Sequence, residues 1–316
     1  MIQIRRLAYA ALVIGFAQIV FGAIVRISGS GLGCGNHWPK CNGVWIPAFS
    51  GSEVIIEVSH RYGALAVSLA VLSLVVLSVL RRREPGIKGR GGIMHLAITA
   101  LALVIAAALL GAITVKLDLP PEIVVVHLAL AMILLAAVAA VAVRAGGFGA
   151  GAILPGSSPK TARGAAAAAI MALMVIVLGG LTANVPGAAA ACRGFPHCAS
   201  GMVGGAGLHV HLAHRVLAIL LVLHVAGLVM SVARRSEAPT LRTASRVAMT
   251  LLVVQVAIAV VLVSFTPSPA LRSLHQATGT AAWLSLAVFA LLARRGRAAA
   301  SERMLVAAPD FAEART

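Results

Sequence analysis

Eight apolar runs, each about 20 residues long, divide this chain of 316 residues almost from end to end. An α-helix of that length crosses the roughly 30 Å hydrocarbon core of a bilayer. Only 11% of the residues are charged, and the mean hydropathy is +0.99, whereas a typical soluble domain has about 25% charged residues. The sequence therefore predicts an all-α integral membrane protein with eight transmembrane helices, at residues 7–25, 58–80, 93–115, 123–143, 166–184, 209–233, 247–265 and 272–293.

The net charge is +17, and most of the positively charged residues lie in loops on one side of the predicted membrane protein. Alternate loops hold 19 of the 26 Lys and Arg residues, at residues 1–6, 81–92, 144–165, 234–246 and 294–316. Loops rich in Lys and Arg stay in the cytoplasm, so both termini are expected there. The basic loops are explained by topology and by contact with anionic membrane lipid. No nucleic-acid partner is expected.

The chain repeats itself. The landmarks of the first half are Cys34, Cys41, the run Glu57-x-x-His60-Arg61, and His127, and those of the second are Cys192, Cys198, the run His211-x-x-His214-Arg215, and His275. The offsets between corresponding landmarks are 158, 157, 154 and 148 residues. Such nearly constant spacing predicts two tandem pseudo-symmetric four-helix bundles that insert with the same orientation. We expect an N-terminal half at 1–143, a cytoplasmic linker at 144–165, a C-terminal half at 166–293 and a disordered cytoplasmic tail at 294–316.

All four cysteines fall in loops assigned to the outer side, as two close pairs. The outer compartment of bacteria is oxidising, so two local disulfides are expected. A zinc site is the alternative, because His37 and His197 lie in the same two loops. The Cys-x-x-Cys spacing typical of such sites is absent.

Four of the ten histidines begin helices that start on the outer side, and they should lie at similar depth: His60, His127, His214 and His275. Polar side chains in a membrane need a partner or a function, because lipid offers no hydrogen bonds. Two imidazoles facing each other across each bundle would supply both axial ligands of one haem iron. A structural, hydrogen-bonded role for each histidine and a non-haem metal site are the alternatives.

Glu57 precedes His60 by three positions, so both side chains share one helix face. The corresponding position in the second half is His211. This difference favours one haem that undergoes chemistry and one that transfers electrons. The alternatives are an ion pair between Glu57 and Arg61 and an exposed acid at the membrane interface. Arg61 and Arg215 suit haem propionates, with interfacial anchoring as the alternative.

The residues also resemble a known family. Val25-Arg-Ile-Ser-Gly-Ser-Gly-Leu-Gly-Cys34, then Trp38-Pro-Lys-Cys41 and Glu57-x-x-His60-Arg61, are similar to haem A synthases, and the resemblance extends over all eight helices. One departure is Gly35-Asn36-His37, where relatives often have a proline and an acidic residue. Members of that family oxidise the C8 methyl group of haem O to a formyl group by successive hydroxylations.

The resemblance implies roles for individual residues. His60 and His127 would flank the substrate haem O, with product haem A formed there and Glu57 as the catalytic carboxylate. His214 and His275 would ligate haem b. Cys34 with Cys41 and Cys192 with Cys198 would be the two loop pairs. The implied partners are haem O synthase (protohaem farnesyltransferase) and an electron donor, in a bacterial plasma membrane with the haem sites near its outer face. A homo-oligomer is compatible with the sequence.

Two other functions fit parts of the pattern. A di-haem b-type membrane cytochrome would relay electrons, but such cytochromes generally need histidine pairs near both membrane faces, and only His95 lies near the inner one. A haem transporter or chaperone would leave the difference between Glu57 and His211 unexplained.

Overall fold

The computed structural model describes residues 1–151, 157–196, 198 and 204–307. Within these ranges the chain is all-helical, and eight helices are long and apolar enough to cross a membrane, as predicted. The elements are α1 Ile2–Ile27, η1 Ser30–Leu32, α2 Ser52–Leu80, α3 Ile93–Lys116, α4 Pro121–Arg144, α5 Pro159–Asn184, α6 Ala206–Arg234, α7 Pro239–Ser264 and α8 Pro269–Ala307.

Several helices begin well before the apolar run that predicts them. Pro159, Pro239 and Pro269 stand at the starts of α5, α7 and α8. Proline favours the first helical position because its fixed φ suits the helix and its missing N–H has no partner there. Helix α8 also continues through residues 294–307, where a disordered tail was expected. That segment is rich in Ala, Arg, Leu and Met, which have high helix propensity. Residues 308–316 of the expected tail lie outside the described residues.

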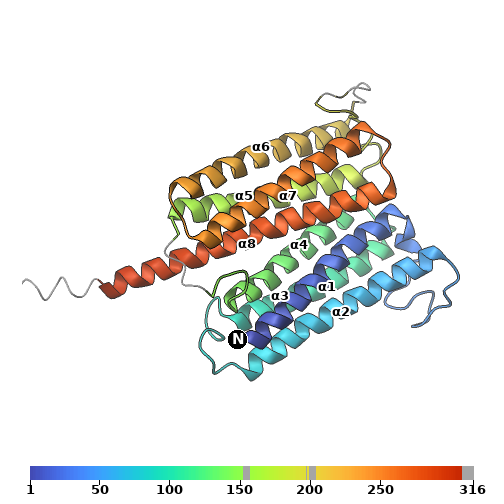
Figure 1. The fold of residues 1–316 in the computed structure, drawn as a ribbon. Helices are drawn as coiled ribbons and strands as arrows, with labels where there is room; N and C mark the ends of the chain where they lie inside the picture. Colours follow the sequence, from blue (N-terminus) through green and yellow to red (C-terminus); the bar gives the residue numbers. More distant parts are fainter. Residues whose placement is uncertain (152–156, 197, 199–203, 308–316) are drawn as a thin grey trace, which may run out of the picture.

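The helices form two groups of four, with the same order of neighbours in each (Figure 1). In the first group α1 packs on α2, α2 on α3, α3 on α4 and α4 back on α1. In the second, α5 packs on α6, α6 on α7, α7 on α8 and α8 back on α5. Helices α1 and α4 meet α5 and α8 between the groups. This ring order supports the expected tandem bundles.

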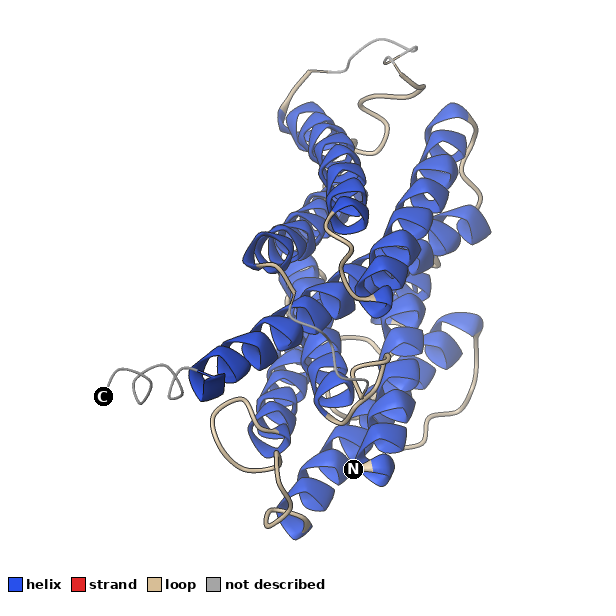
Figure 2. Ribbon diagram, turned by 60° about the vertical axis from the view of Figure 1, so that its left-hand side comes forward, coloured by secondary structure: helices blue, strands red, loops and turns tan. Residues whose placement is uncertain are grey.

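Both cysteine-bearing loops lie at one end of the bundles, and the N-terminus and the end of α8 lie at the other (Figures 1 and 2). We call these the loop end and the terminal end. The large apolar core occupies the terminal end, and it includes Ile4, Leu74, Leu135, Leu241 and Phe289. Helices α4 and α8 bury the largest shares of their spans, 39% and 56%. Apolar side chains on the outward faces of the other helices are left for contact with lipid.

A buried carboxylate ties α5 to the loop between α6 and α7 at the terminal end. Glu237, 6% exposed, accepts a hydrogen bond from the Thr161 hydroxyl at 2.5 Å and one from the Ser158 N–H at 3.3 Å. Arg235 donates to the Thr161 hydroxyl oxygen at 2.9 Å. Because the first N–H groups of a helix lack partners within it, Glu237 acts as a remote cap for α5.

Candidate functional site

The four predicted histidines lie in a layer where the bundles bury few side chains. On α2 no residue at 59–66 is buried, and on α6 none at 212–220 is. In the second bundle the stretch 253–279, which covers the loop ends of α7 and α8, also contains no buried residue. All four histidines are half-buried. This layer separates the large core from small clusters around the cysteine loops.

His60 on α2 is held by α1. A Cβ added to Gly22 would lie 3.1 Å from Cε1 of the His60 ring, so the imidazole rests on bare backbone. The Gln18 amide, one turn earlier on α1, lies 2.9 Å from Nδ1 of His60 and donates to its backbone carbonyl at 2.8 Å. Gln18 is itself accommodated by Gly63, where a Cβ would clash with the amide oxygen. Two small residues and one amide therefore fix the ring.

His127 on α4 completes the first pair. Its ring lies on Gly111 of α3, where a Cβ would approach Cε1 to 3.1 Å. His127 lies on α4, which packs against α1 and α3 in the same bundle as His60. Nδ1 of His127 is buried and has no hydrogen-bond partner among the described residues. A buried polar atom without a partner is rare and needs an explanation, and here it lies in the layer expected to receive a ligand.

The second pair repeats this arrangement with different partners. A Cβ at Gly179 of α5 would lie 2.9 Å from Cε1 of His214, and Nδ1 of His214 lies 2.9 Å from the Val175 carbonyl oxygen. His275 lies on α8, which packs against α5 in the same bundle as His214. The Gln255 amide on α7 lies 3.2 Å from Nδ1 of His275. An imidazole whose Nδ1–H donates to a carbonyl presents Nε2 as a free ligand atom.

These observations fit a haem iron better than another metal. Each half supplies a pair of imidazoles, which is the number of protein ligands that six-coordinate haem needs. No group of three or more His, Cys, Asp or Glu side chains gathers anywhere in the described ranges. The helices around the pairs are apolar. Each site therefore combines two axial ligand candidates with surroundings suited to a large apolar macrocycle.

Glu57 points to the first cysteine loop. Its side chain is 3% exposed, and Oε2 accepts a hydrogen bond from the Cys34 N–H at 2.7 Å. Oε1 accepts from Arg61 at 2.5 Å. The ion pair that the sequence left open as an alternative is thus present. Arg61 also donates to the carbonyl oxygens of Pro39 and Lys40 at 3.3 and 3.0 Å, so the two side chains together bind the loop to α2.

In the second half, His211 and Arg215 bind the second cysteine loop to α6 in the same way, without a carboxylate. We call each such pair of side chains a clamp. Nδ1 of His211, a residue 4% exposed, lies 2.9 Å from the Ala188 carbonyl oxygen. Arg215 donates to the carbonyl oxygens of Cys192 and Gly194 at 2.7 and 2.9 Å. In both halves the arginine after the histidine thus holds a loop. An arginine has five N–H donors, so these contacts leave others for an anionic ligand.

The cysteines form the two expected local disulfides, Cys34 with Cys41 and Cys192 with Cys198. Within each pair the two sulfur atoms are bonded to each other and cannot bind a metal as thiolates. The alternative of a zinc site in these loops therefore does not hold. The disulfides lie beside the clamps formed by Glu57 with Arg61 and by His211 with Arg215.

The remaining histidines are placed elsewhere. His95 is exposed, and His209 is exposed with Nδ1 2.9 Å from the Gly205 carbonyl oxygen. Nε2 of His224 lies 3.0 Å from the Gly164 carbonyl oxygen, which supports a structural role. His37 is exposed in the first loop. His197 lies outside the described residues.

Sequence analysis did not single out the residues that support the rings. Gln18, Gln255, Gly22 and Gly179 are isolated small or polar residues within apolar runs. The repeat carries a signal for them, because Gly22 and Gly179 are 157 residues apart, the same offset as Cys41 and Cys198. Comparing the halves helix by helix would therefore have identified both glycines.

Comparison with known proteins adds an independent line of evidence. A model of the COX15-CtaA family, described as a cytochrome oxidase assembly protein, matches residues 5–287. The Heme A synthase of Bacillus cereus strain ATCC 14579 is 26% identical over 296 residues, which cover 90% of this chain and 91% of that protein. The Heme A synthase of Geobacillus kaustophilus is 34% identical over 120 residues, covering 38% and 36%. That of Bacillus mycoides is 34% identical over 122 residues, covering 37% and 36%. The family match spans both bundles.

Proposed function

The chain belongs to the COX15-CtaA family of cytochrome oxidase assembly proteins, and we propose on this basis that it converts haem O to haem A. The reaction oxidises the C8 methyl group of haem O to a formyl group by successive hydroxylations. The proposal assigns haem O and its product to the first bundle and an electron-transferring haem b to the second. Curated relatives named Heme A synthase, one of them similar over 90% of this chain, support the proposed reaction.

One observation carries the proposal: each bundle holds two half-buried imidazoles in a layer where α2 of the first bundle, and α6, α7 and α8 of the second, bury no side chain. Packed membrane bundles normally fill such a layer with side chains. Bound haem would supply the one-electron redox chemistry of its iron, which no amino-acid side chain provides. His60 with His127, and His214 with His275, would hold the two haems, and the surrounding apolar helices would exclude water from them.

The partners of the two pairs differ, and this supports different roles. In the second bundle His214 is bonded to a backbone carbonyl and His275 lies beside Gln255. In the first, Nδ1 of His127 has no partner in the described part of the chain. The first bundle is also the one in which Glu57 shares a helix face with a histidine of the pair, whereas the second has His211 at that position. We therefore assign exchange of substrate and product to the first pair and permanent binding to the second.

Glu57 is proposed as the acid of the substrate site. It shares a helix face with His60, and its carboxylate forms an ion pair with Arg61. With haem O bound at His60 and His127, a carboxylate on this helix face would stabilise positive charge that develops on the substrate. The same carboxylate positions the first loop through the Cys34 N–H, so loop order and chemistry depend on one side chain.

The proposed orientation places the loop end on the outer side of a bacterial plasma membrane. The terminal end carries most of the Lys and Arg residues, and loops rich in these residues remain in the cytoplasm. The two disulfides then lie in an oxidising compartment. Haem O synthase and a membrane electron donor are the proposed partners, because they would supply the substrate and the electrons.

The test is production of haem A in a bacterial host that makes haem O but no haem A. We expect cells with the wild-type chain to contain hydroxylated haem O and haem A, identified by mass after extraction. The double variant His60→Ala/His127→Ala should make neither but keep a haem b spectrum. The variant His214→Ala/His275→Ala should lose haem b, and His224→Ala should behave as wild type. Two tightly bound haems b in the wild type, with haem O unchanged, would favour an electron-transfer cytochrome instead.

Glu57 needs a test that separates chemistry from loop order. Glu57→Gln keeps an acceptor for the Cys34 N–H but removes the charge, whereas Arg61→Ala removes the loop contacts and keeps the charge. We expect Glu57→Gln to lose formyl product while the first loop keeps its wild-type protection in amide hydrogen exchange. Arg61→Ala should lower protection of the loop and retain part of the product. Normal haem A production by Glu57→Gln would exclude Glu57 from the reaction.

A further inference from the structure

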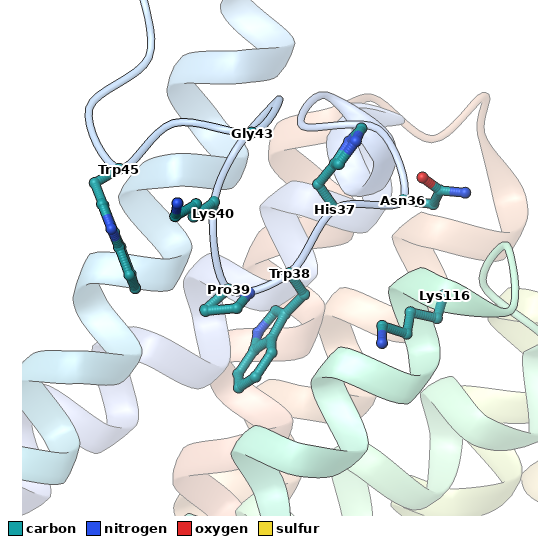
Figure 3. A pocket seen from close by; sticks show the side chains of 8 residues that line it. All are labelled: Asn36, His37, Trp38, Pro39, Lys40, Gly43, Trp45 and Lys116. Atoms are coloured by element: carbon teal, nitrogen blue, oxygen red, sulfur yellow. The ribbon is translucent and has the colours of Figure 1, made fainter.

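A cavity opens at the loop end of the first bundle, between the first cysteine loop and the end of α3 (Figure 3). Its volume is about 490 Å³, and its lining contains two indoles and two lysines but no carboxylate. The side chain of Lys116 extends from α3 toward Trp38, and that of Lys40 extends from the loop toward Trp45 (Figure 3). Aromatic surfaces beside cations suit a flat, apolar molecule that carries negative charge.

The two lysines have no anionic partner in the described part of the chain. Lys40 and Lys116 are two of only four lysines in the whole sequence, and neither takes part in the ion pairs found among described residues. Nζ of Lys40 lies 5.7 Å from the centroid of the Trp45 ring, which orients the ammonium without neutralising it. Two unpaired cations facing one cavity attract an anion.

The cavity adjoins the elements that carry the first histidine pair. The carbonyl of Lys40 is bonded to Arg61, the residue after His60. Lys116 follows Gly111, on which the His127 ring rests, by five residues, about 7.5 Å along the helix axis at 1.5 Å per residue. Lys40 therefore belongs to the loop that Arg61 holds next to His60. Lys116 belongs to α3, the helix on which the His127 ring rests.

The second half does not repeat the lysines. At the offsets of the repeat, 157 and 148 residues, the positions of Lys40 and Lys116 correspond to His197 and Ser264. The pair of lysines thus accompanies the bundle that contains Glu57, which is the bundle assigned to the substrate. A resident haem b and an exchanging haem O carry the same two carboxylates, so a difference between the halves points to capture or orientation of the substrate.

We propose that this cavity receives the two propionate carboxylates of the tetrapyrrole substrate and that Lys40 and Lys116 are the cations that pair with them. The inference rests on the proposed function, because it requires a tetrapyrrole at His60 and His127. Pairing at the rim would set which edge of the macrocycle enters the bundle first. Lys40 and Lys116 would therefore be positioning residues that help to direct the C8 methyl group toward the reacting centre.

The test compares two probes that differ only in charge, ferric protoporphyrin IX and its dimethyl ester. Purified full-length protein is titrated with each probe, and binding is followed by Soret absorbance. The difference between wild type and His60→Ala/His127→Ala isolates the first site. We expect Lys40→Gln/Lys116→Gln to weaken binding of the diacid about tenfold, since each exposed ion pair contributes up to about 1 kcal/mol. Its affinity for the diester should remain that of the wild type.

Two variants serve as controls. Lys40→Arg/Lys116→Arg keeps both charges and should bind the diacid as the wild type does. Lys88→Gln/Lys160→Gln removes the two lysines at the terminal end and should change neither affinity. Unchanged binding of the diester by Lys40→Gln/Lys116→Gln would show that this variant retains a folded site.

Three results would overturn the inference: equal binding of diacid and diester by the wild type, unchanged diacid binding by Lys40→Gln/Lys116→Gln, or equal loss of both probes in that variant. If these occur while the wild type still produces haem A, only the role of the lysines is wrong. If the wild type and His60→Ala/His127→Ala bind both probes equally, the proposed substrate site itself fails.

Discussion

The imidazole of His214 on α6 lies against the backbone of Gly179 on α5, so closely that a methyl group on Gly179 would stand 2.9 Å from Cε1 and 3.2 Å from Nδ1. Gly22 and His60 have the same relationship in the first bundle, at 3.1 Å. Each ring is therefore positioned by a residue that has no side chain. The orientation of the proposed axial ligands depends on this absence, which makes the glycines sensitive positions for substitution.

Gly179→Ala should displace His214 and lower the amount of haem b bound per protein. Forcing an extra methyl group into a packed site costs about 1–3 kcal/mol, and here the neighbour that must move is the ligand. The measurement is Soret absorbance per mole of purified protein. Gly227→Ala on α6 is the matched control, because a Cβ there meets nothing within 4 Å. Full haem content in Gly179→Ala would show that Gly179 does not position the His214 ring.

Gln255→Leu should lower the affinity of the second site for haem, although Gln255 is not one of the proposed iron ligands. The Gln255 amide lies beside both ring nitrogens of His275, and its oxygen accepts a hydrogen bond from the Thr278 hydroxyl. Loss of a residue that orients a metal ligand typically lowers affinity about 10- to 100-fold. The rate of haem transfer to excess apomyoglobin measures this change. Gln3→Leu, at the terminal end, should transfer haem at the wild-type rate.

Arg215→Ala should loosen the second cysteine loop. The guanidinium donates to the carbonyl oxygens of Cys192 and Gly194, and hydrogen bonds to a charged group are each worth about 1.5–3 kcal/mol. Amide hydrogen exchange at residues 188–194 should become faster, while exchange at the terminal end stays unchanged. Arg272→Ala removes an exposed arginine at the same end of the molecule and should not alter the loop. If amide hydrogen exchange of the loop were unchanged in Arg215→Ala, Arg215 would not be the residue that holds the loop.

Glu237→Gln should destabilise the terminal end without affecting either haem site. It replaces a buried carboxylate that accepts hydrogen bonds from Thr161 and Ser158, and we expect a loss of about 1–3 kcal/mol. The midpoint of thermal unfolding in detergent measures the effect. Glu84→Gln, whose carboxylate is 41% exposed, should shift the midpoint little. A similar midpoint for both variants would mean that Glu237 does not cap α5.

The sequence was sufficient for features that the membrane constrains. Uninterrupted apolar runs predicted the eight helices, and the repeat predicted the two groups of four helices. The residues at which the helices begin were harder to predict from the sequence. Helix α7 begins at Pro239, eight residues before its expected span, because a polar turn outside the lipid has no hydrophobic signal. Both disulfides could be expected, because their partners are close in sequence.

The contacts of the site could not be predicted in the same way. Gln18 lies beside His60 only because α1 and α2 pack at one rotation and one depth, and an apolar run does not specify either. Glu57 illustrates the same limit. Its position three residues before His60 was evident, but the partnership with the Cys34 N–H depends on how the first loop folds back over α2.

The uneven filling of the bundles, with a dense terminal end and an open histidine layer, has a consequence for the protein's lifetime in the cell. A ligand that binds only the folded state adds stability, about 4 kcal/mol when its concentration is a thousand times its dissociation constant. Tetrapyrrole would thus supply packing that the polypeptide omits. Cells starved of iron would then accumulate less of this protein at constant synthesis, because the empty form would be degraded faster. Cofactor supply itself would set how much enzyme the membrane retains.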